Sequence, residues 1–211
     1  MSIGIIGAGA LGSNVARLLA KSGISATIAT VVRSRWRISW RNSASIKART
    51  VEETANANIV LVALRWVDRP KALGGLPAWS GRIVIDATNP VAFLDPNSPD
   101  AKDPRDPLAA YGIKAIDLGG RHSSAVFREF VPGALVVKAF NHLDANVLPK
   151  PAVSGQRVLF YSGDDARAKA EVRKIIERTG YFPVDLGLLD VGAPLTSLPF
   201  GSLGSINFIK I

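Results

Sequence analysis

The 211-residue sequence contains no cysteine, one methionine and only two histidines, His122 and His142. The lack of cysteine excludes a disulfide framework, a thiolate metal site and a cysteine nucleophile. No apolar run approaches the ~18 residues that a membrane-spanning helix needs. Because Met1 leads directly into a strand-like apolar run, we also expect no signal peptide. These absences favour a cytoplasmic protein without a membrane partner.

Acidic residues are missing from the first 51 positions, which hold eight lysines and arginines before Glu52. The rest of the chain is nearly balanced, with 18 basic and 17 acidic residues, so the net charge of +9 is concentrated in one region. Trp36 and Trp40 within this basic region could indicate nucleic-acid binding by stacking. Their i, i+4 spacing is more typical of a core-facing helix stripe, and we expect no nucleic-acid partner.

The composition, with 47% hydrophobic and 20% charged residues, is typical of a globular protein. The length predicts one domain over residues 1–211, with a core at 1–143 and a C-terminal extension at 144–211.

A glycine motif stands at the start of the chain. The apolar run Ile3–Ile6 is followed by Gly7-Ala8-Gly9-Ala10-Leu11-Gly12 and then by apolar residues at helical spacing. Glycine is required at the three G-x-G-x-x-G positions for the tight turn, for the approach of a pyrophosphate and for close helix packing. The pyrophosphate would lie at the helix N-terminus, where free N–H groups attract anions. The motif predicts dinucleotide binding, although a tight turn without a ligand is the alternative.

The second predicted strand, residues 25–32, indicates which dinucleotide is bound. An NAD-selective fold places a carboxylate near the end of this strand, about 20 residues beyond the glycines. Here Thr30 ends the strand core, and Arg33 and Arg35 follow. Guanidinium groups bind phosphates in bidentate fashion, so this loop favours the 2′-phosphate of NADP(H). A solvated basic face is the alternative.

Further apolar runs at residues 58–64, 82–87 and 135–140 are typical of strands buried in a parallel sheet. Residues 157–186 predict another βαβ unit. The sequence therefore predicts an α/β, Rossmann-like NAD(P)-binding fold with three αβα layers and a mostly parallel sheet extended by this C-terminal unit.

Open sheets of this kind bind ligands at the carboxyl ends of their strands. Candidate cofactor contacts at these ends are Ala63, Leu64, Asn89 and Ala139. Candidate substrate contacts are Trp66, Asn141, His142 and His122. For Asn89, an Asx turn before Pro90 is an equally good interpretation. Both histidines could instead be structural.

Three other segments carry predictions. Phe93–Pro107 is rich in proline and aspartate, which predicts a long loop, either a lid or a passive excursion. Its aspartates lack the spacing of a calcium loop, and we expect no metal site. A helix is predicted over Ser123–Phe130, capped by Ser123 or Ser124. The apolar tail from Val191 to Ile211 needs covering, either by the chain's own sheet or by a second subunit, and we expect a homodimer that forms through it.

The chain resembles the F420-dependent NADP oxidoreductase family. The matching segments are IGIIGAGALG (3–12), IVLVALRW (59–66), GRIVIDATNP (81–90), LGGRHSSAVF (118–127), VVKAFNHL (136–143) and SGDDARAK (162–169). The resemblance implies hydride exchange between NADPH and the deazaflavin coenzyme F420, with the NADP phosphates bound at residues 8–11. The chain departs from the family pattern at Thr30-Val31, where Ser-Arg is usual, and at Arg65-Trp66, where Pro-Trp is common.

Hydride transfer between two bound rings requires positioning and exclusion of water rather than a catalytic triad, so we expect no catalytic side chain. The acceptor would be F420 or a flavin, FMN or FAD. Two alternatives stay open: an NADP-dependent reductase of a small carbonyl or imine, and a non-catalytic NADP(H)-binding sensor.

Overall fold

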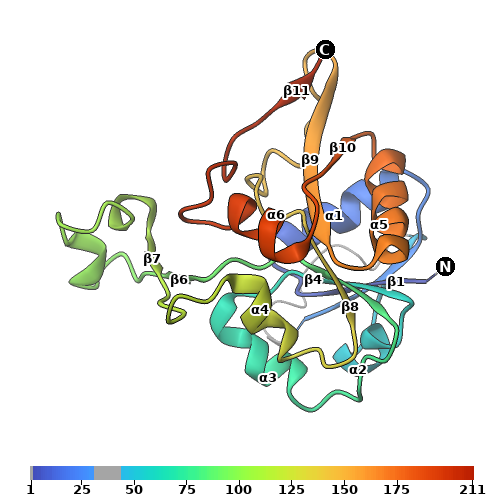
Figure 1. Ribbon diagram of the computed structural model, residues 1–211, viewed down its shortest axis with the longest axis horizontal. Helices are drawn as coiled ribbons and strands as arrows, with labels where there is room; N and C mark the ends of the chain where they lie inside the picture. The colour runs from blue at the N-terminus through green and yellow to red at the C-terminus, as the bar shows by residue number, and fades with distance from the viewer. Residues whose placement is uncertain (1, 31–43) are drawn as a thin grey trace.

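The computed structural model describes residues 2–30 and 44–211, and it is built around one mixed sheet (Figure 1). The strands lie in the order β10-β9-β8-β5-β4-β1-β2-β3. Their bounds are β1 Ile3–Ile6, β2 Ala26–Ala29, β3 Ile46–Ala48, β4 Ile59–Val62, β5 Ile83–Asp86, β8 Leu135–Ala139, β9 Gln156–Gly163 and β10 Phe182–Asp185. The six strands from β3 to β8 are parallel, as predicted.

The C-terminal extension continues this sheet in the opposite direction. Strand β9 pairs antiparallel with β8, and β10 pairs parallel with β9 across helix α5 (Ala166–Arg178). The predicted βαβ unit is therefore confirmed, and its strands run against those of the core. A short last strand, β11 (Ile209–Lys210), pairs with the start of β9.

Helices cover both faces of the sheet and give the predicted three layers (Figure 1). One hydrophobic cluster joins the sheet to α1 (Ala10–Lys21) and α5. A second cluster joins the other face to four shorter helices, α2 (Val51–Ala55), α3 (Arg69–Leu73), α4 (Ser123–Arg128) and α6 (Leu189–Thr196). The fold is a Rossmann-like NAD(P)-binding fold. Among the described helices, none combines the length and apolar character that crossing a membrane requires.

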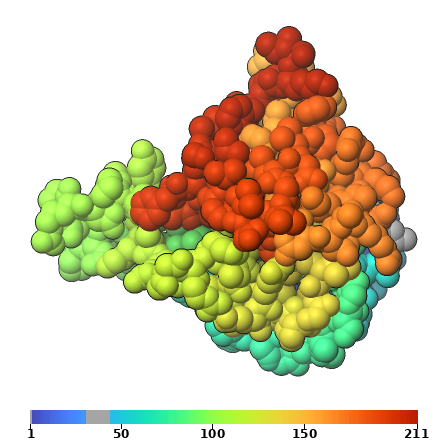
Figure 2. Space-filling model, viewed as in Figure 1, coloured from blue at the N-terminus to red at the C-terminus, as the bar shows by residue number. Residues whose placement is uncertain are grey.

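An antiparallel hairpin, β6 (Val91–Phe93) with β7 (Ile113–Ala115), forms an arm that projects from the body (Figures 1 and 2). The predicted loop 93–107 lies at its tip. Two corrections apply: Phe93 ends a strand, and Asp100–Lys102 form a 3₁₀ turn, which is followed by another at Ala109–Tyr111. Aspartate side chains hold the turns by accepting backbone N–H groups, as Asp95 does from Asn97.

The predicted cap of α4 is also corrected. The N-cap is His122, whose Nδ1 accepts a hydrogen bond from the N–H of Ala125 at 3.3 Å. An imidazole nitrogen can accept this hydrogen bond as a hydroxyl oxygen does. Histidine is not a usual N-cap residue, so the sequence favoured the neighbouring serines.

An ion pair lies within the sheet, between Asp86 at the end of β5 and Lys138 in β8. The Nζ–Oδ2 distance is 2.9 Å, and both side chains are fully buried. Lys138 Nζ also donates to the carbonyl of Thr88 at 2.5 Å, and Asp86 Oδ1 accepts from the N–H and the hydroxyl of Thr88. Burial lowers the pKa of Lys138, and the charge of Asp86 acts in the opposite direction. The pair fixes the segment that follows β5.

Replacing Lys138 by methionine should destabilise the protein by about 3 to 5 kcal/mol, because the carboxylate of Asp86 would stay buried without its partner. Urea unfolding at neutral pH measures the loss. In the double variant Lys138→Met, Asp86→Asn the loss should be smaller, since an amide carries no charge. A single-variant loss below about 1 kcal/mol would show that the pair contributes little.

Candidate cofactor cleft

The glycine motif forms the corner between β1 and α1, and two of its positions have no room for a side chain. Gly7 has φ +115°, and a Cβ there would lie 2.2 Å from the carbonyl oxygen of Ala63. A Cβ on Gly12 would lie 1.9 Å from the carbonyl oxygen of Gly7. The glycines therefore allow β1, α1 and the end of β4 to approach one another closely.

The first turn of α1 is open to an anion. Its N-cap is Gly9, which has no side chain to cap the helix, and the first turn contains no acidic residue. The unpaired N–H groups and the helix dipole both favour a negatively charged group at this position.

A cleft of about 470 Å³ runs from this corner along the ends of β4, β5 and β8. It brings together eight of the predicted site residues: Gly9, Ala10, Leu11, Ala63, Leu64, Trp66, Asn89 and Asn141. Gly7, Ala8 and Gly12 belong to the corner beside it. Strands about 4.8 Å apart place the end of β8 on the order of 14 Å from the end of β1, so the cleft can follow an extended dinucleotide.

Other predicted residues lie elsewhere. Ala139 is fully buried in β8 and does not line the cleft. Thr30 directly follows β2 and also lies outside the cleft lining. Arg33 and Arg35 fall outside the residues that the structure describes, and so do Trp36 and Trp40.

Trp66 is held in the cleft wall by Arg69, a residue that the sequence did not single out. The Cζ atom of Arg69 lies 3.1 Å from the centroid of the Trp66 ring, and its Nε donates to the Trp66 carbonyl at 2.9 Å. Burial lowers the pKa of Arg69 to about 10, while the nearby charge of Asp86 acts in the opposite direction. Arg69 therefore stays protonated at neutral pH, and its cation supports the indole ring.

Asn89 and Asn141 form a reciprocal amide pair. Asn89 Nδ2 donates to the Asn141 carbonyl at 2.8 Å, and Asn141 Nδ2 donates to Asn89 Oδ1 at 3.1 Å. Asn89 Oδ1 also accepts a hydrogen bond from the N–H of Leu198. Asn141 Nδ2 also donates to the backbone carbonyl of Thr196. The pair fastens the C-terminal segment to the ends of β5 and β8.

A second cavity, of about 580 Å³, lies between the base of the arm and the C-terminal segment. Its lining includes Pro90, Ile116, Leu118, His122 and Phe200. Leu198 lines both this cavity and the cofactor cleft, so it forms their common wall. The lining by Leu198 and Phe200 could not be predicted, because these residues reach the site only when the C-terminal segment folds back.

The geometry of His122 assigns its tautomer. Since Nδ1 accepts the N–H of Ala125, the neutral imidazole carries its proton on Nε2. His122 therefore offers a hydrogen-bond donor to the second cavity.

His142, in contrast, is fully buried and lines neither cavity. Its ring packs against Phe160 with a centroid distance of 5.0 Å. Burial lowers the pKa of His142 to about 4, while a backbone hydrogen bond with Val158 acts in the opposite direction. We therefore leave this histidine out of the candidate site.

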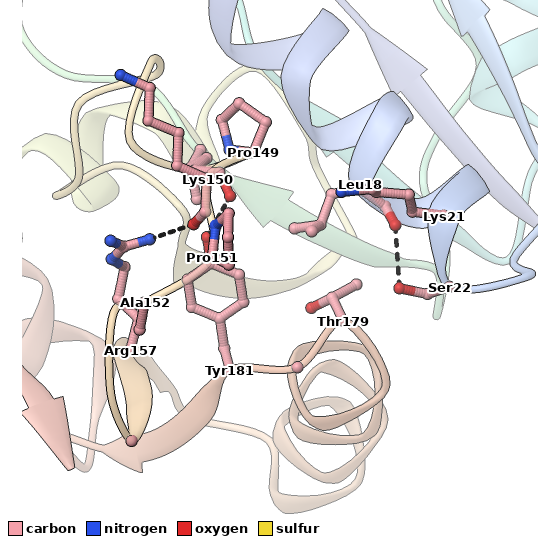
Figure 3. A pocket seen from close by; sticks show the side chains of 13 residues that line it. Leu18, Lys21, Ser22, Pro149, Lys150, Pro151, Ala152, Arg157, Thr179 and Tyr181 are labelled. Atoms are coloured by element: carbon pink, nitrogen blue, oxygen red, sulfur yellow. Dashed lines mark hydrogen bonds between the residues drawn. The ribbon is translucent and has the colours of Figure 1, made fainter. Parts of the chain in front are cut away.

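A third cavity, of about 420 Å³, lies between the end of α1 and the start of β10 (Figure 3). Polar groups here bond to the backbone: Ser22 Oγ to the carbonyl of Leu18, Tyr181 Oη to that of Leu148, and Arg157 Nη1 to that of Lys150. This cavity is separate from the glycine corner. Among the described residues, no group of three or more His, Asp or Glu could hold a metal ion.

The fold and the cleft define a Rossmann-like NAD(P)-binding protein. The family model for coenzyme F420-dependent NADP oxidoreductases matches residues 2–90. A hypothetical protein of Sinorhizobium meliloti is 35% identical with a TM-score of 0.84, and the match covers 100% of this chain and 96% of that one. A protein of Arthrobacter sp. FB24, provisionally named an F420-dependent NADP reductase, is 26% identical with a TM-score of 0.73, over 99% and 98% of the chains. The chain belongs to the F420-dependent NADP oxidoreductase family and is thus an NAD(P)-binding oxidoreductase of that family.

Two more distant matches are longer proteins. The metalloreductase STEAP3 of Rattus norvegicus is 23% identical over 204 residues, which cover 96% of this chain and 37% of the rat protein. The chain thus spans little more than a third of this curated relative. A reductive aminase of Aspergillus terreus, solved with NADPH and ethyl levulinate, is 18% identical with a TM-score of 0.58, over 93% of this chain and 57% of that one. That likeness concerns the fold alone.

The buried His142 predicts a pH dependence of stability. Its folded pKa of about 4 lies below the ordinary value of 6.5, so the unfolded chain binds the proton more readily between these values. The stability associated with neutral His142 is complete above pH 6.5 and is lost as the pH falls toward 4. Between pH 7.5 and pH 5 the loss should be about 2 kcal/mol.

Urea unfolding at a series of pH values measures this loss. His142→Phe should flatten the dependence between pH 7.5 and 5, whereas His122→Gln, at the other histidine, should leave it in place. An unchanged pH dependence in His142→Phe would contradict the assignment.

Proposed function

We propose that the protein is an NADPH-dependent reductase that transfers a hydride from NADPH to coenzyme F420 or to a flavin such as FMN or FAD. The observation that carries the proposal is the pair of adjoining cavities: a cleft beginning at the glycine corner and a second cavity beyond Leu198. The arrangement suits two ring systems that meet at the ends of β5 and β8.

The residues of the corner would hold the dinucleotide. The backbone N–H groups of Gly9, Ala10 and Leu11 would bind the diphosphate, and the ends of β4 and β5 would support the nicotinamide half. Thr30, Arg33 and Arg35 remain our candidates for the 2′-phosphate. The bound dinucleotide supplies the hydride, and the chain supplies position and a water-poor surface, with Trp66 fixed by Arg69.

The second cavity would hold the acceptor. Ile116, Leu118 and Phe200 offer an apolar surface for a flat ring, and His122 offers its Nε2–H to a ring oxygen or nitrogen. The Asn89–Asn141 pair would contribute indirectly: Asn89 accepts the N–H of Leu198 and so holds Leu198 between the cofactor cleft and the second cavity.

Mixing the purified protein with NADPH and F420, FMN or FAD, and following the loss of the 340 nm band, tests the proposal. We expect NADPH oxidation with at least one of these acceptors at a rate that increases with enzyme concentration. Binding of NADPH without oxidation by any acceptor would favour the sensor, and turnover of a small imine or carbonyl alone would favour the other alternative. As a control for cofactor choice, NADPH should have a lower KM than NADH, and equal values would remove the 2′-phosphate assignment.

We also propose that the protein is a homodimer whose subunits meet through the C-terminal segment. Within one subunit, part of this segment is buried, including Leu189 and Ala193, but several of its apolar side chains are exposed. They are Val191, Leu195, Ile206, Phe208 and Ile211. Burying them against a second copy would remove this surface from water. Light scattering should give twice the 22.4 kDa chain mass, and a monomer at micromolar concentration would contradict the proposal.

A further inference from the structure

An arginine without a polar partner stands at the rim of the cofactor cleft. Arg65 follows β4, lines the cleft and is exposed. Within residues 2–30 and 44–211 its guanidinium forms no ion pair and no hydrogen bond, and Cζ lies 5.2 Å from the ring centroid of Phe93. Its bonding capacity is therefore available to a ligand.

Six other arginines of the described chain are engaged by protein groups. Arg105, Arg121, Arg128 and Arg173 pair with carboxylates, and Arg82 and Arg157 donate to backbone carbonyls. Asp144, an acidic residue of the cleft lining, is engaged by the N–H of Asn146. Arg65 and Asp144 line the same cleft, but the two side chains form no ion pair with each other.

The contact with Phe93 fixes the direction in which this cation lies. Phe93 ends β6 at the base of the arm, and Val91 and Ile113 of the same hairpin also line the cleft. The guanidinium therefore stands on the arm side of the cleft, the side that the second cavity adjoins at Pro90. The glycine corner follows β1, which pairs with the other side of β4 from β5, and the backbone N–H groups of α1 would bind the diphosphate there.

We propose that Arg65 determines acceptor specificity by binding the anionic group, a phosphate or carboxylate, that the acceptor carries on its side chain. The proposal rests on the proposed function, since it requires an acceptor beside the dinucleotide. A guanidinium binds such a group through two parallel N–H···O bonds, and Phe93 offers an apolar edge to the adjoining part of the ligand. The residue contributes charge at the rim and takes no part in the hydride step.

The pair FMN and riboflavin tests this proposal, because the two share one ring and differ by a phosphate. In the parent protein the KM for riboflavin should exceed that for FMN by about tenfold, the factor that corresponds to 1.4 kcal/mol. In Arg65→Gln the two values should agree within about twofold, through a rise in the KM for FMN, with kcat at saturating FMN unchanged. Raising the ionic strength to about 1 M should reduce the preference of the parent protein in the same way.

Arg167→Gln is the matched control, since it removes the same charge from an exposed position on α5 outside the cleft lining. It should keep the preference for FMN. Arg65→Lys should keep part of it, because a point charge remains without the bidentate geometry.

The outcomes separate this proposal from the proposed function. Turnover of both flavins with equal KM in the parent protein would overturn the role of Arg65 and leave the reductase function standing. A raised KM for NADPH in Arg65→Gln, with the FMN preference retained, would assign Arg65 to the dinucleotide and also overturn it. Absence of turnover with every acceptor would overturn both proposals.

Discussion

The close approach of three backbone segments at the first β-to-α corner is the constraint on which the site depends. The carbonyl of Gly7 meets Gly12 of α1, and the carbonyl of Ala63 meets Gly7 itself. Side chains at these positions would separate α1 from the end of β4 by the width of a methyl group or more. Because the corner closes without them, the N-terminus of α1 lies at the edge where the parallel strands end, and the cleft begins there.

The same edge explains why charges are buried beneath the cleft. Ile6, Val62, Asp86 and Lys138 lie in one register row across β1, β4, β5 and β8, the row nearest the ends of β1, β4 and β5. Asp86 and Lys138 are thus immediately below the segment that they fix, and Arg69 adds a second cation beneath Trp66. Burying these charged groups costs free energy, so we infer that they serve to fix positions rather than to add stability. Lys138 holds Thr88 and Arg69 holds Trp66, and each cation has few alternative partners in the interior.

The sequence predicted those parts of the molecule whose physics is local. Glycine spacing located the corner, and continuous apolar runs located the parallel strands, because both patterns arise within one segment. The side on which a residue faces was harder to predict: Ala139 and His142 are near the end of β8, yet both point into packed interior. The pairing of Asn89 with Asn141, and the return of Leu198 between the two cavities, depend on contacts across 52 and 109 residues. No local pattern encodes such contacts.

These contacts indicate that different parts of the site have different roles. The glycine corner would bind the diphosphate through backbone N–H groups. Because any sequence with the same glycines offers these N–H groups, the corner cannot distinguish one acceptor from another. Behind it, Trp66, Thr88 and Asn89 are fixed by Arg69, Lys138 and Asn141, and substitution there would disturb the fold as well as the ligand. Arg65, Phe93 and Phe200 are exposed at the rim and can change without unfolding the chain. Under the proposed function, selectivity for the acceptor therefore belongs to the rim, while the interior keeps the geometry that hydride transfer needs.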